Sequence, residues 1–289
     1  MNKWIIGSRP KTLPAAIAPV FVGTSLIQVD GQPINWFNAL LALAVSLLLQ
    51  IGVNYSNDYS DGVRGTDSER VGPIRLVASG LATSKQVKQA AFLAFFLASV
   101  SGLILALRTS PWLIAVGVIA IIAAWNYTGG KNPYGYLGFG EISVFIFFGV
   151  VATVGSYFAQ SQKISWQSLL ISIPMGSLAC SILAINNLRD LPKDALVNKK
   201  TLAVRLGDLR ARKALIGLLI VSQITSALAY LITPWALITL IAIPLTLGIS
   251  KAISSGQSGK ELIPLLGKAG KLQLATALLI TLALTLSRA

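Results

Sequence analysis

WFNALLALAVSLLLQIGVNYSNDYSD, residues 36–61, is the stretch that decides the class of fold. Its first part is almost wholly apolar over the length of about 20 residues that a helix needs to cross a bilayer. Its last eight residues then hold two asparagines and two aspartates. The stretch predicts a membrane-spanning helix that ends in a polar, acidic segment.

The composition of the whole chain agrees with this interpretation. Of its 289 residues, 54% are hydrophobic and 12% are charged, whereas a soluble globular protein carries about 25% charged residues. A water-facing domain of this length would need far more polar surface. The sequence therefore predicts an all-α membrane protein that crosses the bilayer several times.

Nine apolar segments are long enough to be candidate spans. They cover residues 12–29, 36–57, 86–107, 111–128, 139–160, 166–188, 213–231, 234–251 and 271–288. We expect one intramembrane domain, residues 1–289, built from two tandem four-helix units, about 12–128 and 139–251, followed by a ninth helix.

The basic residues predict the orientation of these spans. With nine spans, 21 of the 24 Lys and Arg residues fall on the side of the N-terminus and three on the other side. By the positive-inside rule, the N-terminus is cytoplasmic. We expect a multi-pass protein of the plasma membrane. The net charge of +14 is then explained by basic loops on the cytoplasmic side of the lipid bilayer, and no nucleic-acid partner is expected.

Two absences restrict the chemistry. The chain has no His and one Cys, which excludes Ser-His-Asp triads, His-ligated metals and a disulfide framework. A metal ion would have to be held by oxygen atoms, and this favours a hard cation such as Mg2+.

The acidic residues are concentrated in two places. Six of the ten lie in NYSNDYSDGVRGTDSER, residues 54–70, and NNLRDLPKD, residues 186–194. Asn54, Asp58 and Asp61 have the spacing of one helix face, and so do Asn186, Asp190 and Asp194. The two Asn-x3-Asp patterns are 132 residues apart, each at the end of the second span of a predicted unit. This repetition supports the duplication and predicts a site where the two units meet.

Facing carboxylates repel each other unless a divalent cation is shared between them, and such a cation leaves positions open for phosphate oxygens. Basic residues in the same loops would suit a phosphate ligand. The chain has no GxxxxGK[ST] motif, which argues against a nucleotide. A diphosphate with an apolar prenyl tail suits a site of this kind inside a membrane protein.

The quoted motifs resemble those of a known family. NDYSDGVRGTD (57–67) and NNLRDLPKDALVNKKTLAVRLGD (186–208) resemble the two Asp-rich motifs of the UbiA superfamily of intramembrane aromatic prenyltransferases. SRPKTLPAAIAPVFVGT (8–24), RVGPIRLVASG (70–80) and YTGGKNPYGYLGFGE (127–141) are similar to the branch that acts on 1,4-dihydroxy-2-naphthoate.

The resemblance implies an activity. Mg2+ would bridge the carboxylates and a polyprenyl diphosphate, the bond to the diphosphate would ionise, and the naphthoate ring would attack the allylic cation and lose its carboxylate as CO2. The product would be a demethylmenaquinol of menaquinone biosynthesis.

The resemblance also implies roles for residues. Tyr127 and Lys131 are the expected catalytic residues. The expected metal ligands are Asp58, Asp61, Asp190, Asp194 and Asp67, although Asp67 departs from the spacing of many relatives, in which the third Asp stands at the position of Gly65. The expected substrate-binding residues are Asn54, Asn57, Arg64, Arg75, Asn186, Arg189 and Lys200.

The sequence leaves alternatives open for the acceptor, for the function and for the placement of the N-terminal segment. A related enzyme could use 4-hydroxybenzoate, homogentisate or a haem as acceptor. An ion-coupled transporter is less consistent, because its acids should lie near the middle of the membrane. Residues 2–11 are expected to lie along the membrane interface, with capping of the acceptor pocket as the alternative.

Overall fold

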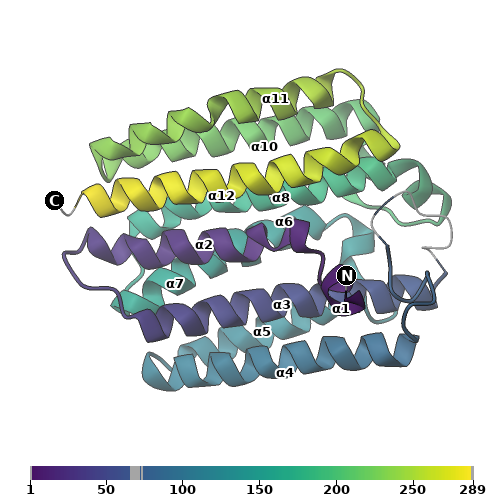
Figure 1. Ribbon diagram of the computed structural model, residues 1–289, viewed down its shortest axis with the longest axis horizontal. Helices are drawn as coiled ribbons and strands as arrows, with labels where there is room; N and C mark the ends of the chain where they lie inside the picture. Colours follow the sequence, from purple (N-terminus) through teal and green to yellow (C-terminus); the bar gives the residue numbers. More distant parts are fainter. Residues whose placement is uncertain (1, 66–71, 73, 288–289) are drawn as a thin grey trace.

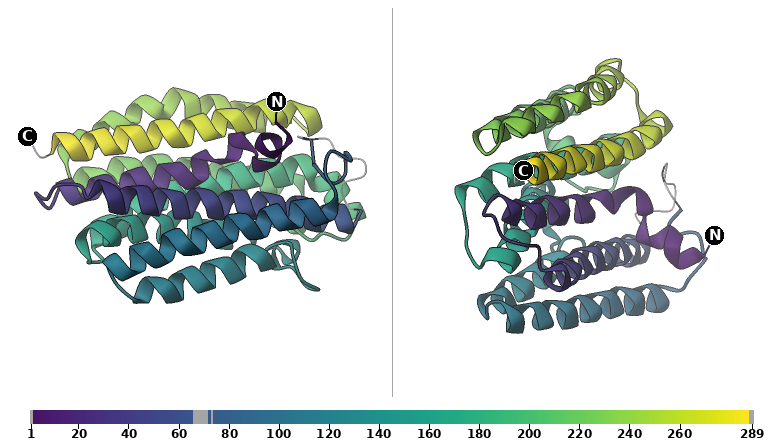
Figure 2. Two further views of the ribbon diagram at one scale, coloured as in Figure 1. Left: turned by 60° about the horizontal axis from the view of Figure 1, so that its bottom comes forward. Right: turned by 60° about the vertical axis from the view of Figure 1, so that its left-hand side comes forward.

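The computed structural model describes residues 2–65, 72 and 74–287. Within these ranges the chain is helical with no strand, as the sequence predicts. The helices run roughly along one direction (Figure 1), with α10 and α11 at one edge of the bundle and α4 and α5 at the opposite edge (Figure 2). Helix α1 and the C-terminal end of α12 lie at opposite ends of this bundle.

The elements follow the chain in a simple order. Their bounds are α1 Lys3–Ser8, η1 Pro10–Thr12, α2 Pro14–Ser25, η2 Leu26–Gln28, α3 Trp36–Val63, α4 Ser84–Arg108, α5 Trp112–Asn126, η3 Tyr134–Leu137, α6 Gly140–Val144, η4 Phe145–Val151, α7 Ala152–Ser161, α8 Trp166–Leu196, α9 Leu202–Leu206, α10 Asp208–Leu228, η5 Ala229–Leu231, η6 Pro234–Ala242, α11 Ile243–Ser254, η7 Gly259–Leu262 and α12 Ile263–Leu286.

Seven helical segments of the described chain are long and apolar enough to cross a membrane. An eighth is formed if Lys3–Thr12 and Pro14–Gln28, which meet at a bend of 56°, count as one span. The remaining expected segment, 111–128, corresponds to α5. Its 15 residues rise about 22 Å, which is short of a hydrocarbon core of about 30 Å.

Local sequence explains where the long helices begin. The Thr83 hydroxyl accepts the backbone N–H of Gln86 at 3.3 Å, and the Gln86 side chain accepts the backbone N–H of Thr83 at 3.1 Å, so α4 starts with a capping box. Ser165 and Ser168 form the same reciprocal pair at the start of α8. These caps satisfy backbone donors that the first turn of a helix leaves without partners.

Two expected boundaries are wrong. The segment between the predicted spans 166–188 and 213–231 is largely helical, because α8 continues to Leu196 and is followed by α9 and α10. The helix that contains the last predicted span, 271–288, begins earlier, at Ile263. Hydropathy detects only the apolar part of a helix, so charged turns that continue it beyond the membrane were assigned to loops.

Helix α8 is the centre of the bundle. In its most apolar window 72% of the residues are buried inside the molecule, a larger share than in any of the other six spans. It packs against α10, α12 and α2, and also against the π-helical segment η4 between α6 and α7. Because α8 also carries the second acidic motif, this packing fixes one wall of the candidate active site.

Candidate active site

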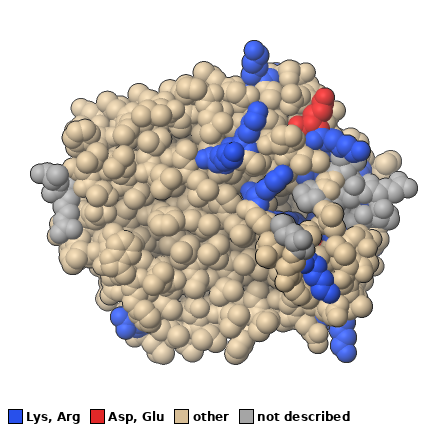
Figure 3. All heavy atoms as spheres, viewed as in Figure 1, with Lys and Arg blue, Asp and Glu red and all other residues tan. Residues whose placement is uncertain are grey.

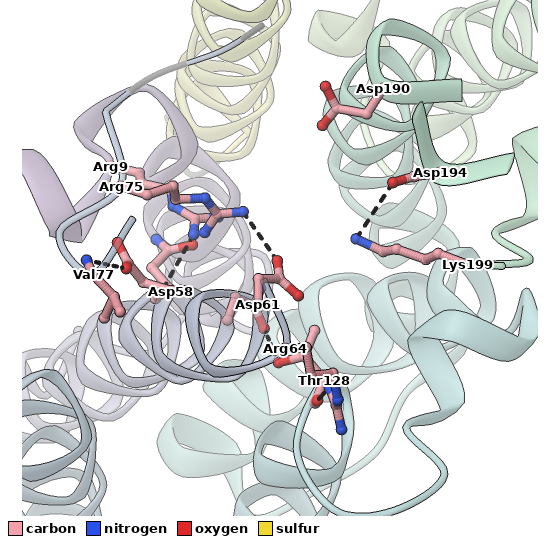
Figure 4. A network of polar contacts seen from close by, with 12 residues as sticks. Arg9, Asp58, Asp61, Arg64, Arg75, Val77, Thr128, Asp190, Asp194 and Lys199 are labelled. Carbon is pink, nitrogen blue, oxygen red and sulfur yellow. Dashed lines mark hydrogen bonds and ion pairs between the residues drawn. The ribbon is translucent and has the colours of Figure 1, made fainter. Parts of the chain in front are cut away.

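The two acidic motifs lie on the last turns of α3 and α8. Asp58 and Asp61 belong to α3, and Asp190 and Asp194 belong to α8, which continues through Pro192. Figure 4 shows Asp61 on the side of α3 that faces Asp194 and Lys199. The structure therefore brings the two motifs to the same end of the bundle, as their spacing predicts.

Asp58 is turned toward the loop that follows α3. Its carboxylate accepts the backbone N–H of Leu76 at 2.7 Å and that of Val77 at 3.0 Å, and the residue is only 1% exposed. In Figure 4 it points toward Val77 and away from the second motif. Asp58 thus holds the loop after the first motif in place.

Asp61 is the acid of the first motif that faces the second. One of its oxygens lies 3.3 Å from Nη2 of Arg75, and the other accepts the hydroxyl hydrogen of Tyr136. Both Asp61 and Arg75 are buried. Because a buried carboxylate is costly without partners, these contacts provide a partner for each carboxylate oxygen of Asp61.

The acids of the second motif also contact cations. Arg189 donates two hydrogen bonds of 2.7 Å to the carboxylate of Asp190. Nζ of Lys199 lies 3.8 Å from Asp194. The remaining Nη1 of Arg189 and Nζ of Lys193 are buried and have no hydrogen-bond partner in the described part of the chain. Buried cationic nitrogens of this kind suit an anionic ligand with several oxygens.

The loop between α5 and α6 connects the two motifs. The guanidinium of Arg64 donates to the carbonyl oxygens of Thr128 and Gly130 and lies 5.2 Å from the ring centre of Tyr136. Lys199 lies 4.9 Å from the same ring centre. Arg64 therefore positions the loop, and Tyr136 lies between the cations of both motifs.

A cavity of about 260 Å3 extends from this end into the bundle. Its walls are mostly apolar side chains of α2, α3, α4, α5, η4, α7 and α8. Its polar end includes Asn54, Asn57 and Asn186, each of which precedes an acid of the two motifs by one helical turn. The cavity thus ends directly beneath the acidic motifs.

Tyr127 lies at this polar end of the cavity. Its ring meets the edge of Tyr134 with 5.5 Å between ring centres. Burial raises the pKa of the Tyr134 hydroxyl, which donates to the carbonyl of Ala123 at 2.8 Å. Tyr134 therefore remains a neutral donor that braces the ring of Tyr127.

Some of the expected site residues also make contacts within the protein. The amide of Asn54 donates to Ser8 and Thr12, and Asn57 accepts the hydroxyl hydrogen of Thr128 at 2.6 Å. Lys131 and Lys200 are exposed. No contact of their side chains with the acidic motifs is found among the described residues.

The acids do not form a preassembled metal cluster. Across residues 2–65, 72 and 74–287, no group of three acidic, His or Cys side chains is close enough to hold an ion. The donor chemistry nevertheless fits Mg2+, because Asp61, Asp190 and Asp194 supply only oxygen ligands. Asp67 lies outside the described residues.

Sequence reasoning missed Tyr136 as a site residue. Tyr136 stands in YTGGKNPYGYLGFGE, so it lies within a motif that had been recognised. The signal was present, but nothing in the spacing of a loop predicts which of its side chains turns toward the acids.

Charged side chains at the surface are unevenly distributed between the two ends of the molecule. On the face seen in Figure 3, most Lys and Arg side chains gather toward the end that carries α1 and the loop after α3, while the opposite end is nearly bare.

Comparisons with known proteins match these observations. Residues 16–263 match the family described as UbiA prenyltransferase family. A 1,4-dihydroxy-2-naphthoate octaprenyltransferase of Mycobacterium tuberculosis is 51% identical over 98% of this chain and 96% of its own length. The Escherichia coli protein of the same name is 37% identical over 99% of this chain and 96% of its own. Among solved structures, a UbiA homologue from Archaeoglobus fulgidus bound to GPP and Mg2+ superposes with a TM-score of 0.72 at 18% identity, over 98% of this chain and 99% of that one.

Proposed function

Because this chain belongs to the UbiA prenyltransferase family, we propose that it transfers a polyprenyl group from a polyprenyl diphosphate to 1,4-dihydroxy-2-naphthoate. The carboxylate leaves as CO2, and the product is a demethylmenaquinol of menaquinone biosynthesis. The observation that carries this proposal is the 51% identity, over nearly the whole length of both chains, to a relative named for this acceptor. The apolar cavity beneath two acidic motifs is consistent with it.

In this proposal the prenyl tail occupies the cavity, and the diphosphate binds among the cations at its polar end. Arg75, Arg189, Lys193 and Lys199 are the nearest candidates, because each contacts an acid of the two motifs or has a buried nitrogen without a partner among the described residues. Lys131 keeps its predicted catalytic role, in which it would hold the departing diphosphate, and Lys200 keeps its predicted role in substrate binding.

Mg2+ is the proposed cofactor. Asp61, Asp190 and Asp194 would hold it, with Asp67 as a further candidate and Asp58 as immediate support. Bound there, Mg2+ would act as a Lewis acid on the leaving diphosphate. The side chains of this chain then orient the substrates: the ring of Tyr127, at the polar end of the cavity, is placed to stabilise positive charge on the prenyl carbon.

The proposed topology has nine spans with a cytoplasmic N-terminus in the plasma membrane. Helix α5 would be a short span. The two bent segments Lys3–Thr12 and Pro14–Gln28 would together form the first span. The opposite positions of α1 and the end of α12 agree with an odd number of crossings, and the 21-to-3 division of basic residues favours an active site that faces the cytoplasm.

We also propose that the single domain arose by duplication of a four-helix unit, about 12–128 and 139–251. Two features support this. The Asn-x3-Asp pattern occupies the last turns of both α3 and α8. Each of these helices packs closely against the next long helix of its unit, α4 and α10 respectively.

A related acceptor is the alternative within the same chemistry, since a site for Mg2+ and a diphosphate does not by itself select the ring that is prenylated. The deciding experiment uses purified protein, Mg2+, a labelled polyprenyl diphosphate and a panel of aromatic acceptors. With the naphthoate labelled in its carboxyl group, one labelled CO2 should be released per prenyl group transferred. Turnover of 4-hydroxybenzoate but not of the naphthoate would overturn the proposed acceptor.

A further inference from the structure

Arg9 is the one charged side chain among the described residues that line the cavity. It lies between α1 and η1, four residues before the bend at Leu13 where the N-terminal segment turns into α2. The sequence had suggested that residues 2–11 lie along the membrane interface. In the structure α1 packs on α3, where the Tyr55 hydroxyl donates to the carbonyl of Trp4 at 2.7 Å, and Arg9 reaches the polar end of the cavity.

The backbone at Arg9 has a conformation that Arg rarely adopts. Its φ is +53°, in the left-handed region where a side chain costs roughly 1–2 kcal/mol relative to the right-handed one. Glycine would occupy this position without that cost. An Arg at a position that suits glycine is consistent with a role for the side chain itself.

Asn54 fixes this turn from the side of α3. Its amide donates to the carbonyl of Ser8 at 2.8 Å and to the hydroxyl of Thr12 at 3.1 Å. Its own backbone carbonyl accepts Nη2 of Arg9 at 3.2 Å. Asn54 therefore contacts residues on both sides of Arg9 as well as its guanidinium.

We infer that Arg9 binds the carboxylate of the aromatic acceptor and that Asn54 is the positioning residue that holds Arg9 for this contact. The inference rests on the proposed function. A carboxylate buried in an apolar cavity requires a cationic partner, and a guanidinium matches its geometry with two parallel hydrogen bonds. Arg189 and Lys200, which the sequence predicts as substrate-binding residues, do not line the cavity.

The position of Arg9 favours the acceptor over the diphosphate. The cations proposed for the diphosphate are grouped with Asp61, Asp190 and Asp194, and none of them lines the cavity. Arg9 shares the polar end of the cavity with Tyr127 and Asn186. An acceptor held there would lie next to the carbon of the prenyl group to which the ring must bond.

The test compares Arg9→Gln with Lys11→Gln, which removes a positive charge two residues away at an exposed position outside the cavity. Because a hydrogen bond to a charged group contributes about 1.5–3 kcal/mol, Arg9→Gln should raise the KM for the naphthoate by about 10- to 100-fold. The KM for the polyprenyl diphosphate should stay unchanged, and Lys11→Gln should resemble the wild type in both constants.

A carboxylate-free acceptor gives a second readout. The wild type should prefer 1,4-dihydroxy-2-naphthoate over 1,4-dihydroxynaphthalene, and Arg9→Gln should lose most of this preference. Arg9→Lys, which keeps the charge but not the planar fork, should lie between the two. If Arg9→Gln does not fold, Arg9→Lys is compared with the wild type in its place, by the KM for the naphthoate and by the preference for the carboxylated acceptor.

Asn54→Ala should also raise the KM for the naphthoate. The double variant with Arg9→Gln should have the same KM for the naphthoate as Arg9→Gln alone, because both substitutions remove the same contact. A selective rise in the KM for the prenyl diphosphate, or an unchanged preference for the carboxylated acceptor, would overturn the inference. Failure of the proposed function is distinguishable, because the wild type would then not prenylate the naphthoate at all.

Discussion

Tyr136 donates its hydroxyl hydrogen to Asp61, and this bond joins the loop between α5 and α6 to the acidic end of α3. The ring of Tyr136 also lies beside Arg64 and Lys199. One side chain thus contacts an acid of the first motif and a cation that follows the second. Orientation of Asp61 therefore depends on a residue far from it in the sequence.

Tyr136→Phe removes this hydrogen bond and keeps the ring. Since a hydrogen bond to a charged group contributes about 1.5–3 kcal/mol, we expect kcat/KM to fall by about 10- to 100-fold. The measurement is turnover over a range of Mg2+ concentrations. Tyr230→Phe, at an exposed position of η5, is the control, and equal activity of both variants would show that Tyr136 does not support the site.

The acids that face each other should be essential for turnover. Asp61→Asn, Asp190→Asn and Asp194→Asn retain the shape of the side chain but remove the charge that would hold Mg2+. Each should abolish most turnover while the protein remains folded and inserted. EDTA should inactivate the wild type, with recovery on addition of Mg2+. Asp208→Asn, which changes a largely exposed acid paired with Arg212, should remain active, and near-normal rates in two of the three site variants would contradict the proposed metal site.

Asp58→Asn should behave differently from these variants. Its carboxylate accepts two backbone N–H groups in a buried position, and an amide can accept with only one of its two groups. We expect the free energy of unfolding to fall by about 1–3 kcal/mol, with activity lost as the loop loosens. Thermal unfolding in detergent measures this, and a stability equal to that of Asp61→Asn would show that Asp58 is not the support of the loop.

Gly149 should tolerate no side chain. A Cβ at this position would lie 2.6 Å from Cα of Gly176, because η4 and α8 approach each other closely here. Overpacking of this kind costs about 1–3 kcal/mol, so Gly149→Ala should lower the unfolding temperature. The control is Gly248→Ala in α11, where a Cβ would meet nothing within 4 Å; there the unfolding temperature should not fall.

The proposed orientation can be tested with cysteine reporters. In a Cys180→Ser background, Leu196→Cys and Ile164→Cys place thiols at exposed positions near opposite ends of α8. A membrane-impermeant thiol reagent added to intact cells should label only position 164. Labelling of position 196 from outside would reverse the topology, and with it the side from which the substrates enter.

The sequence by itself determined the helical membrane class, the positions of the apolar segments and the two acidic motifs. These follow from properties that are local or periodic: runs of apolar residues, the i, i+4 spacing of Asn54 and Asp58, and the same spacing at Asn186 and Asp190. Nine spans and the cytoplasmic orientation were predicted in the same way and remain predictions.

Tertiary structure decided what each polar side chain contacts. Asp58 and Asp61 are three residues apart on one helix face, yet one accepts two backbone N–H groups of a loop and the other accepts a hydrogen from Tyr136. Arg9 belongs to the motif SRPKTLPAAIAPVFVGT, but the motif does not show what its side chain contacts, and it is the packing of α1 on α3 that places Arg9 at the cavity. Spacing along a helix fixes the direction in which a side chain points, whereas its partner depends on which distant segment packs there, and only the folded chain determines that.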